Sequence, residues 1–212
     1  MMLKEKICYF WTVFCLVTSK TPRVPFITDK SFIDECVQSH NEFRSRVDPP
    51  AADMKQMSWS ASLAKVAKNW ANQCRFEHNG CLSTPYACDS NYQFLGENIW
   101  MGTANIFSPK SAIEAWYNET EHFTFDNLQC TEVCGHYTQV VWAASNRVGC
   151  AVSTCSSTNS LNNLIFVCNY GPAGNFQGTH PYTKGAPCSL CETGDTCIKR
   201  LCIFKEQQNL KV

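Results

Sequence analysis

The chain has 212 residues, with 18 acidic and 18 basic side chains and a hydrophobic share of 44%. A formal net charge of zero provides no basic excess for nucleic acid or an anionic membrane, and no acidic block suggests a solvating tail. The length suffices for one sizeable domain and a small appendage.

The N-terminus is typical of a secretory signal peptide. Lys4 and Lys6 supply its positive end, and residues 7–17 form an apolar run that is too short for a spanning helix of about 20 residues. Val17 and Ser19 resemble the small residues that precede a cleavage site. A buried N-terminal helix is the competing interpretation, but this run has no polar face. We therefore expect a signal peptide over residues 1–19 and a secreted, extracellular protein without a transmembrane segment.

The cysteines point to an oxidising compartment. Of 15 cysteines, Cys8 and Cys15 lie in the predicted signal peptide, which leaves 13. Secreted cysteines form disulfides, and an odd number leaves one free or paired with another chain. The pairs Cys188/Cys191 and Cys197/Cys202 also have a spacing seen in zinc sites. Secretion favours disulfides over this zinc interpretation.

Three helices are predicted from hydrophobic periodicity and start signals. The first begins at Ser31 and is broken by the segment 48–53, and the second runs over about residues 60–74. Ser108 followed by Pro109 is a strong start signal for the third.

Three segments have the composition of strands. Residues 96–101 predict a short strand, and residues 147–155 and 164–171 are rich in β-forming side chains. Turn-forming Ser, Thr and Asn fill the interval 156–163. The last two strands should therefore be antiparallel neighbours.

The chain changes character after Tyr182. Residues 184–202 contain four cysteines and almost no large apolar side chains. Such a segment cannot build a core and must be held by disulfides. The sequence therefore predicts a separate cysteine-rich hinge module over residues 184–204, followed by a tail over residues 205–212.

Four segments in order resemble the signature motifs of one family: "HNEFR" (40–44), "GENI" (96–99), "GHYTQVVW" (135–142) and "FVCNYGPAGNFQG" (166–178). They are similar to those of the CAP superfamily, which joins cysteine-rich secretory, antigen 5 and pathogenesis-related 1 proteins. The resemblance is closest to the glioma pathogenesis-related 1-like branch. It implies an α+β fold, a three-layer α-β-α sandwich, for a CAP domain over residues 20–183.

The same resemblance implies a cleft lined by His78, Glu97, Glu119 and His136. Two imidazoles with two carboxylates suit a weak, exchangeable Zn²⁺ site, metal-free acid–base chemistry, or a hydrogen-bonded cluster that stiffens the cleft. The family cleft favours the metal. The family often has Ser where this chain has Asn79, which argues against a serine nucleophile there.

Residues near these four have simpler interpretations. His40 lies on the apolar stripe of its helix and is predicted to be a buried core histidine. Tyr137 and Gln139 are expected in the packing and hydrogen-bond network of their motif. Asn118 begins the chain's sole N-x-S/T sequon, and since helix neighbours point about 100° apart, a glycan on Asn118 leaves Glu119 free to face the cleft.

Disulfide pairing is implied by the resemblance. The pairs taken from the family are Cys74–Cys155, Cys130–Cys134, Cys150–Cys168, Cys188–Cys197 and Cys191–Cys202. Once these are assigned, Cys81 and Cys88 remain and are close enough in the chain to bridge their own loop. Cys36 is then the odd cysteine, on a buried helix stripe.

The sequence favours a non-enzymatic recognition protein. It contains neither a G-x-S-x-G elbow nor an H-E-x-x-H helix. The related branch is associated with the male reproductive tract, which implies a peripheral place on the sperm surface and a role in gamete binding. The expected partner is a cell-surface protein or a lipid such as a sterol, and the expected state is a monomer or weak dimer. The alternative is a secreted protease-like or esterase-like hydrolase that uses Glu119 and the histidines.

Overall fold

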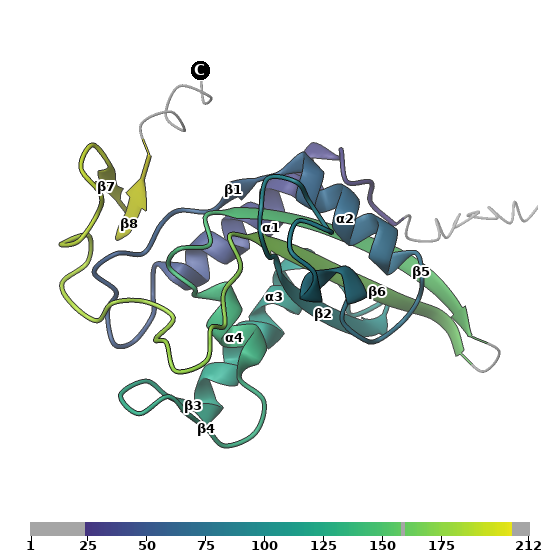
Figure 1. Cartoon of the computed structure of the whole chain (residues 1–212). Coiled ribbons are helices and arrows are strands. Elements are labelled where there is room, and N and C mark those ends of the chain that lie inside the picture. Colours follow the sequence, from purple (N-terminus) through teal and green to yellow (C-terminus); the bar gives the residue numbers. More distant parts are fainter. Residues whose placement is uncertain (1–23, 158–159, 205–212) are drawn as a thin grey trace, which may run out of the picture.

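The structure is a computed structural model that describes residues 24–157 and 160–204 (Figure 1). The predicted signal peptide over residues 1–19 and the predicted tail over residues 205–212 lie outside these ranges.

A four-stranded sheet forms the middle of the molecule. Its long central strands pair antiparallel from Arg147↔Gly171 onward, which confirms the expected neighbours. One edge strand pairs antiparallel with this hairpin, and a two-residue strand pairs parallel with it at the other edge. In spatial order the strands are β1 (Ser58–Trp59), β5 (Arg147–Ser157), β6 (Ser160–Gly171) and β2 (Gly96–Thr103).

Helices cover both faces of the sheet, so the fold is the expected α-β-α sandwich (Figure 1). Small side chains of one helix, Ala67 and Ala71, pack on one face against Ala151 and its neighbours. Larger side chains such as Phe32 and Trp116 pack on the other face in the main core. The single helix is α2 (Ala61–Ala71), and the opposite layer holds α1 (Lys30–Arg44), α3 (Pro109–Asn118) and α4 (Gly135–Val140).

The helix starts follow local chemistry. Helix α1 begins at Lys30, one residue before the predicted start, with Asp29 at its N-cap. Helix α3 begins where predicted, with Ser108 and Ser111 capping each other reciprocally. Helix α2 has the predicted Ser60 cap but ends at Ala71, before the predicted Cys74, which adopts a left-handed backbone with φ 55°.

Short elements fill the connections. The segment between α2 and β2 contains η1 (Gly80–Ser83), and η2 (Glu119–His122) continues directly from α3. Two small hairpins follow. They are formed by β3 (Phe123–Thr124) with β4 (Gln129–Cys130), and by β7 (Thr196–Ile198) with β8 (Leu201–Ile203).

Six disulfides join the described cysteines, and Cys36 is free and buried. One of them, Cys150–Cys168, directly links β5 to β6. Five of them have the pairing that the family resemblance implied, and the sixth, Cys81–Cys88, joins the two cysteines that this pairing left over. The five are Cys74–Cys155, Cys130–Cys134, Cys150–Cys168, Cys188–Cys197 and Cys191–Cys202.

The β7–β8 hairpin packs on the larger domain that precedes it. Cys202 donates its N–H to the carbonyl of Met54 (2.8 Å), and its carbonyl accepts from Gln56 (2.9 Å). Leu201 is only 2% exposed and belongs to the main core. The segment thus buries more than its composition suggested, because all three residues of β8 are buried, among them the apolar Leu201 and Ile203.

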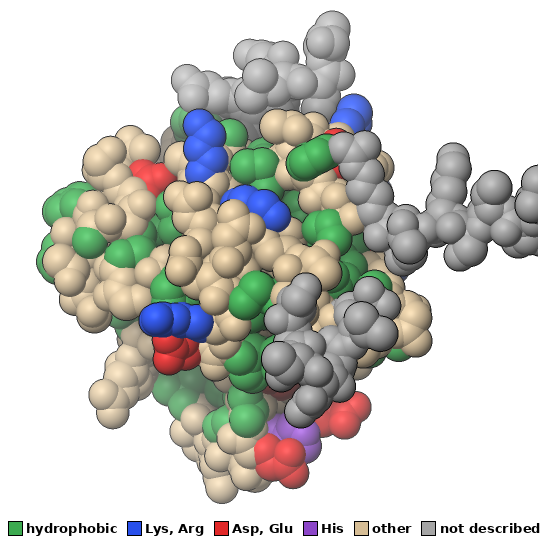
Figure 2. Space-filling model, turned by 90° about the vertical axis from the view of Figure 1, so that its right-hand side faces the viewer, with side chains coloured by type: hydrophobic (Ala, Val, Ile, Leu, Met, Phe, Trp, Pro, Cys, Tyr) green, Lys and Arg blue, Asp and Glu red, His purple; other side chains and the backbone are tan. Residues whose placement is uncertain are grey.

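On the face drawn in Figure 2, acidic and basic side chains lie in small separate groups without a broad region of one sign. This distribution agrees with the neutral composition. No helix among the described residues is long and apolar enough to cross a membrane.

Candidate functional site

The first histidine–glutamate pair is built on the edge strand β2. The Glu97 side chain is completely buried, and its Oε1 accepts the backbone N–H of Asn79 (2.9 Å). His78 Nδ1 lies 3.0 Å from the same oxygen, while Oε2 accepts from Asn169 Nδ2 (3.2 Å). Because an ionised carboxylate only accepts hydrogen bonds, Nδ1 of His78 is the protonated nitrogen.

Glu97 also changes the acidity of His78. The hydrogen bond to the carboxylate raises the pKa of the imidazole above its ordinary value, and partial burial opposes this rise. The His78 side chain is 64% exposed, so the ring is accessible to a ligand.

The second pair joins the end of α3 to the start of α4. Glu119 caps the C-terminus of α3, and its Oε2 accepts the backbone N–H groups of His136 (3.0 Å) and Tyr137 (3.2 Å). Its Oε1 lies 2.6 Å from His136 Nδ1. Trp116 stacks on the imidazole with an interplanar angle of 11°. His136 is therefore held by a carboxylate on its edge and by an indole on its face.

Strand β2 connects the two pairs. Glu97 lies opposite Asn169 in the sheet register, and alternation turns the next side chain, Asn98, to the opposite face. Asn98 Nδ2 donates to the backbone carbonyl of His136 (3.0 Å). Both histidines thus adjoin the same edge strand, His78 through the Glu97 side chain and His136 through the Asn98 side chain.

Both imidazoles use the same nitrogen to contact their carboxylate. Nδ1 of His78 and of His136 contacts a carboxylate, and within the described residues neither Nε2 has a hydrogen-bond partner. A carboxylate that orients Nδ1–H and leaves Nε2 available is the common arrangement around histidine metal ligands. Glu97 and Glu119 use their oxygens in these hydrogen bonds, so they fit the role of orienting partners better than that of direct ligands.

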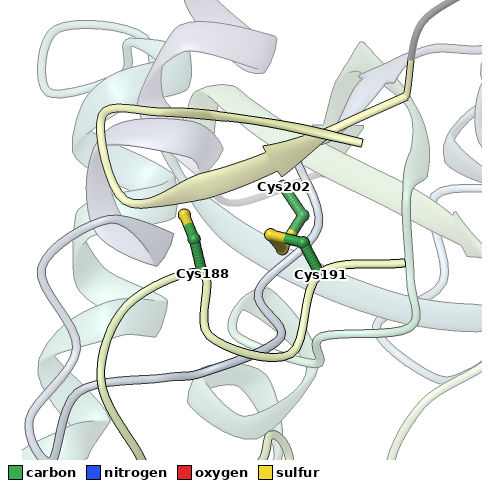
Figure 3. A group of neighbouring side chains, drawn as sticks. All are labelled: Cys188, Cys191 and Cys202. Carbon is green, nitrogen blue, oxygen red and sulfur yellow. A yellow bond between two sulfur atoms is a disulfide. The ribbon is translucent and has the colours of Figure 1, made fainter. Parts of the chain in front are cut away.

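The four residues do not form a closed metal cage. Among the residues that the structure describes, only the sulfurs of Cys188, Cys191 and Cys202 form a group of three within 4.8 Å of one another (Figure 3), and all three sulfurs are in disulfides. A metal at the two histidines would therefore need water or a partner's groups to complete its coordination. Structural zinc sites have four protein ligands, so a two-histidine site is expected to be weak.

The other histidines lie elsewhere. His40 is fully buried between the carbonyl of Cys36 (2.7 Å) and Tyr170 Oη (2.9 Å), as a core histidine should be. His122 lies 3.5 Å from a Glu132 oxygen, and the His180 ring packs on Phe125.

Packing explains the remaining polar residues of the "GHYTQ" motif. Tyr137 and Gln139 are both 1% exposed, and Gln139 donates to Ser145 Oγ (3.1 Å) and accepts from the N–H of Gly174 (3.1 Å). Their predicted structural role is confirmed.

Sequence reasoning missed three residues that hold the pairs in place: Asn98, Trp116 and Asn169. The available signal was an asparagine inside an otherwise apolar strand, because a buried amide needs partners. Asn98 and Asn169 are 1% and 0% exposed. The exposure of Asn118 keeps its predicted glycosylation feasible, and this modification stays a prediction.

These motifs and this fold define the class of the protein. Residues 37–170 match the model of the cysteine-rich secretory protein family, CAP. The chain belongs to this family, as the four sequence motifs indicated.

Relatives that are similar over most of the chain support the predicted branch. The chain is 53% identical over 203 residues to GLIPR1-like protein 1 of Homo sapiens, covering 95% of this chain and 84% of that protein. It is 51% identical over 180 residues to glioma pathogenesis-related protein 1 of Mus musculus, covering 85% and 68% of the two chains.

Solved structures share the fold. The crystal structure of NaASP2 with Zn²⁺ is 34% identical with a TM-score of 0.66, covering 82% of this chain and 96% of that one. The crystal structure of Na-ASP-1 is 30% identical with a TM-score of 0.67, covering 86% and 52%.

Proposed function

We propose that this protein is a secreted, non-enzymatic recognition protein in which His78 and His136 bind a divalent transition metal such as Zn²⁺. One observation carries the metal proposal: each imidazole is oriented through Nδ1 by a carboxylate, with Nε2 left for a ligand. The bound ion would supply a positive, exchangeable coordination point beside β2. The solved NaASP2 structure with Zn²⁺ supports this choice of metal.

The site chemistry favours recognition over hydrolysis. The His136–Glu119 pair resembles the oriented base of a hydrolase, which supports the enzymatic alternative. An activated nucleophile, however, needs a hydroxyl or thiol within hydrogen-bond reach of the base. Across the described ranges, neither His78 nor His136 contacts such a group. Asn79, where relatives often have Ser, uses its side chain to accept from Cys81 N (3.2 Å).

The biological setting is proposed from the resemblance to the related branch. It comprises secretion, a peripheral place on the sperm surface and a role in gamete binding, with a cell-surface protein or a sterol-like lipid as the partner. The six disulfides support an extracellular place, because such bonds persist in oxidising compartments.

Calorimetry with Zn²⁺ tests the metal site. The variant His78→Ala/His136→Ala should lose most of the affinity, whereas the matched control His122→Ala/His180→Ala should keep it. The wild-type affinity should fall from about pH 7.5 to about pH 5.5, because only neutral imidazole binds metal and protons compete. Equal affinity in the two double variants would place the zinc elsewhere.

Binding to intact cells separates recognition from catalysis. The labelled wild type should bind sperm or eggs saturably and should hydrolyse neither peptide nor ester probes above the blank rate. Turnover that the His78→Ala/His136→Ala variant abolishes, with cell binding unchanged, would instead establish the hydrolase.

A further inference from the structure

A tight turn displays an aromatic ring in the connection between α2 and β2. The N–H of Ala87 donates to the carbonyl of Thr84 (3.2 Å), which closes a β-turn with Pro85 and Tyr86 at its two central positions. Proline has the fixed φ that suits the first of these positions. Residues 83–87 are all exposed, and Tyr86 is exposed by 58%. The turn therefore presents the Tyr86 ring to solvent.

Tyr86 adopts a backbone conformation that a bulky side chain disfavours. Its φ is 60°, in the left-handed region, where the Cβ of an L-residue crowds the backbone. The second central position of a turn with this geometry favours Gly or Asn. Either residue would form the turn with less strain than tyrosine does. The local fold thus gives no reason for a tyrosine at this position.

The other non-glycine residues with a positive φ in the described ranges have local reasons for it. Two are cysteines in disulfides, two form the turn of the β7–β8 hairpin, one is an asparagine and one is a partly buried leucine. In that order they are Cys74, Cys188, Lys199, Arg200, Asn175 and Leu128. Tyr86 differs from them, because within the described part of the chain its hydroxyl has no hydrogen-bond partner and its ring has no aromatic neighbour.

Two restraints hold the turn in place. The disulfide Cys81–Cys88 closes the loop on either side of it, with a sequence separation of 7. The N–H of Tyr86 itself donates to the carbonyl of Gln93 (2.9 Å), which ties the tip of the turn to the segment before β2. A side chain displayed on such a preorganised loop loses little conformational entropy when a partner binds it.

We propose that Tyr86 is an anchor for a protein partner, and that its ring enters an apolar pocket of that partner. This inference rests on the recognition role proposed above. The segment 81–88 contains no charged side chain, so the pocket should be neutral, with a polar group for the phenol hydroxyl. One ring beside Ser83 and Thr84, without a cation, offers too little apolar area and charge to bind a lipid surface. Buried tyrosines commonly dominate protein interfaces.

Binding of the labelled protein to intact sperm and eggs tests the anchor. Tyr86→Asn removes the ring and introduces a residue that tolerates the left-handed backbone, so saturable binding should weaken at least about tenfold. Tyr86→Phe keeps the ring and should bind within about threefold of the wild type. The matched control Ile106→Asn removes a similarly exposed apolar side chain (60%) and should bind as the wild type does. Full binding by Tyr86→Asn would overturn the anchor alone, whereas a wild type that binds neither cell would overturn the recognition function with it.

Thermal unfolding separates docking from a structural role. Because the ring has no partner within the described residues, Tyr86→Asn should melt at the wild-type temperature or up to about 3 °C above it. A lower melting temperature would assign the ring to the fold and overturn the proposal. Vesicles of phosphatidylcholine and cholesterol test a lipid surface instead of a protein. The wild type should not bind them, and vesicle binding that Tyr86→Asn abolishes would overturn the assignment of a protein partner.

Discussion

His40 and Arg44 lie one turn apart on α1, and both polar side chains are completely buried. Arg44 donates to the carbonyls of Lys55, Val140, Trp142 and Ala143 at 2.6–3.1 Å, so its guanidinium ties the end of α4, the turn after it and the segment at Lys55 to α1. Burial lowers the pKa of Arg44 to about 9, which still leaves it protonated at neutral pH. A single fork of donors thus satisfies several buried carbonyls at once.

His40 should make the fold sensitive to acid. Burial lowers the pKa of His40 to about 4, with the charge of Arg44 acting in the same direction and the hydrogen bond to Cys36 opposing. Between the unfolded pKa of about 6.5 and this value, only the unfolded chain binds the proton. The free energy of unfolding should therefore fall as pH drops through this window, by about 3 kcal/mol at most.

Urea unfolding at pH 7 and pH 4.5 measures this contribution. His40→Gln cannot take up a proton in this range, so it should lose less stability on acidification than the wild type. Identical losses in the two proteins would show that His40 does not titrate as the buried geometry requires.

Replacing Arg44 should be costly even when the charge is kept. Arg44→Lys offers a single ammonium where the guanidinium reaches four carbonyls, and each unpaired buried carbonyl is unfavourable. The free energy of unfolding should fall by about 2–4 kcal/mol. The exposed neighbour Arg46 is the control, with less than about 0.5 kcal/mol for Arg46→Lys. Similar effects for both variants would contradict the anchoring role.

At the scale of elements, a close approach between α2 and β5 determines the position of α2 on its face of the sheet. The N–H of Ser60 donates to the carbonyl of Val148 (2.8 Å), so the first turn of α2 begins directly over β5. Gly149 lies beneath this turn. A Cβ at that position would meet the backbone of Ala64 at 2.1 Å and the carbonyl of Ser60 at 2.6 Å.

Gly149→Ala should therefore displace α2. Backbone atoms cannot move aside as a side chain can, so we expect a loss of about 3 kcal/mol in the free energy of unfolding. Gly80→Ala is the matched control, because a Cβ there meets nothing within 4 Å, and it should change stability by less than about 0.5 kcal/mol. Thermal unfolding of both variants provides the comparison, and a tolerated Gly149→Ala would mean that α2 can shift freely.

At the scale of the whole molecule, the hinge module and the CAP domain share structure. Strand β8 exchanges backbone hydrogen bonds with residues 54–56, and Leu190 donates its N–H to the carbonyl of Ala52 (2.9 Å). The boundary predicted at residue 184 thus crosses a packed contact rather than an exposed linker. A substitution that destabilises the hinge module should therefore also destabilise the part of the CAP domain that it contacts.

Leu201→Ala tests this coupling. Leu201 is 2% exposed, and truncating such a side chain should lower the free energy of unfolding by about 2–4 kcal/mol. Hydrogen exchange should accelerate at Gln56 as well as at Cys202, since their amides belong to the shared contact. Ile198→Ala, opposite Leu201 on β7 but 44% exposed, should have little effect. Acceleration confined to residues 184–204 would show that the module is independent.

Local patterns in the sequence were sufficient to predict the family, the three main helices and the antiparallel pairing of β5 with β6. Hydrophobic periodicity identifies buried helix faces, and Ser108–Pro109 is a start signal that acts within a single turn. The family motifs also pointed to His78, Glu97, Glu119 and His136. Their chemical role stays a proposal, because a motif states residue types and not which atoms face a ligand.

Only the tertiary structure decided how these residues are used. The engagement of both Nδ1 atoms, the link from Asn98 to His136 and the packing of Leu201 depend on residues far apart in the chain. Such contacts are set by how the layers pack, and they leave no period or spacing in the sequence. The spacing of the hinge cysteines likewise does not reveal that Cys202 exchanges backbone hydrogen bonds with Met54 and Gln56, because these partners lie about 150 residues away in the chain.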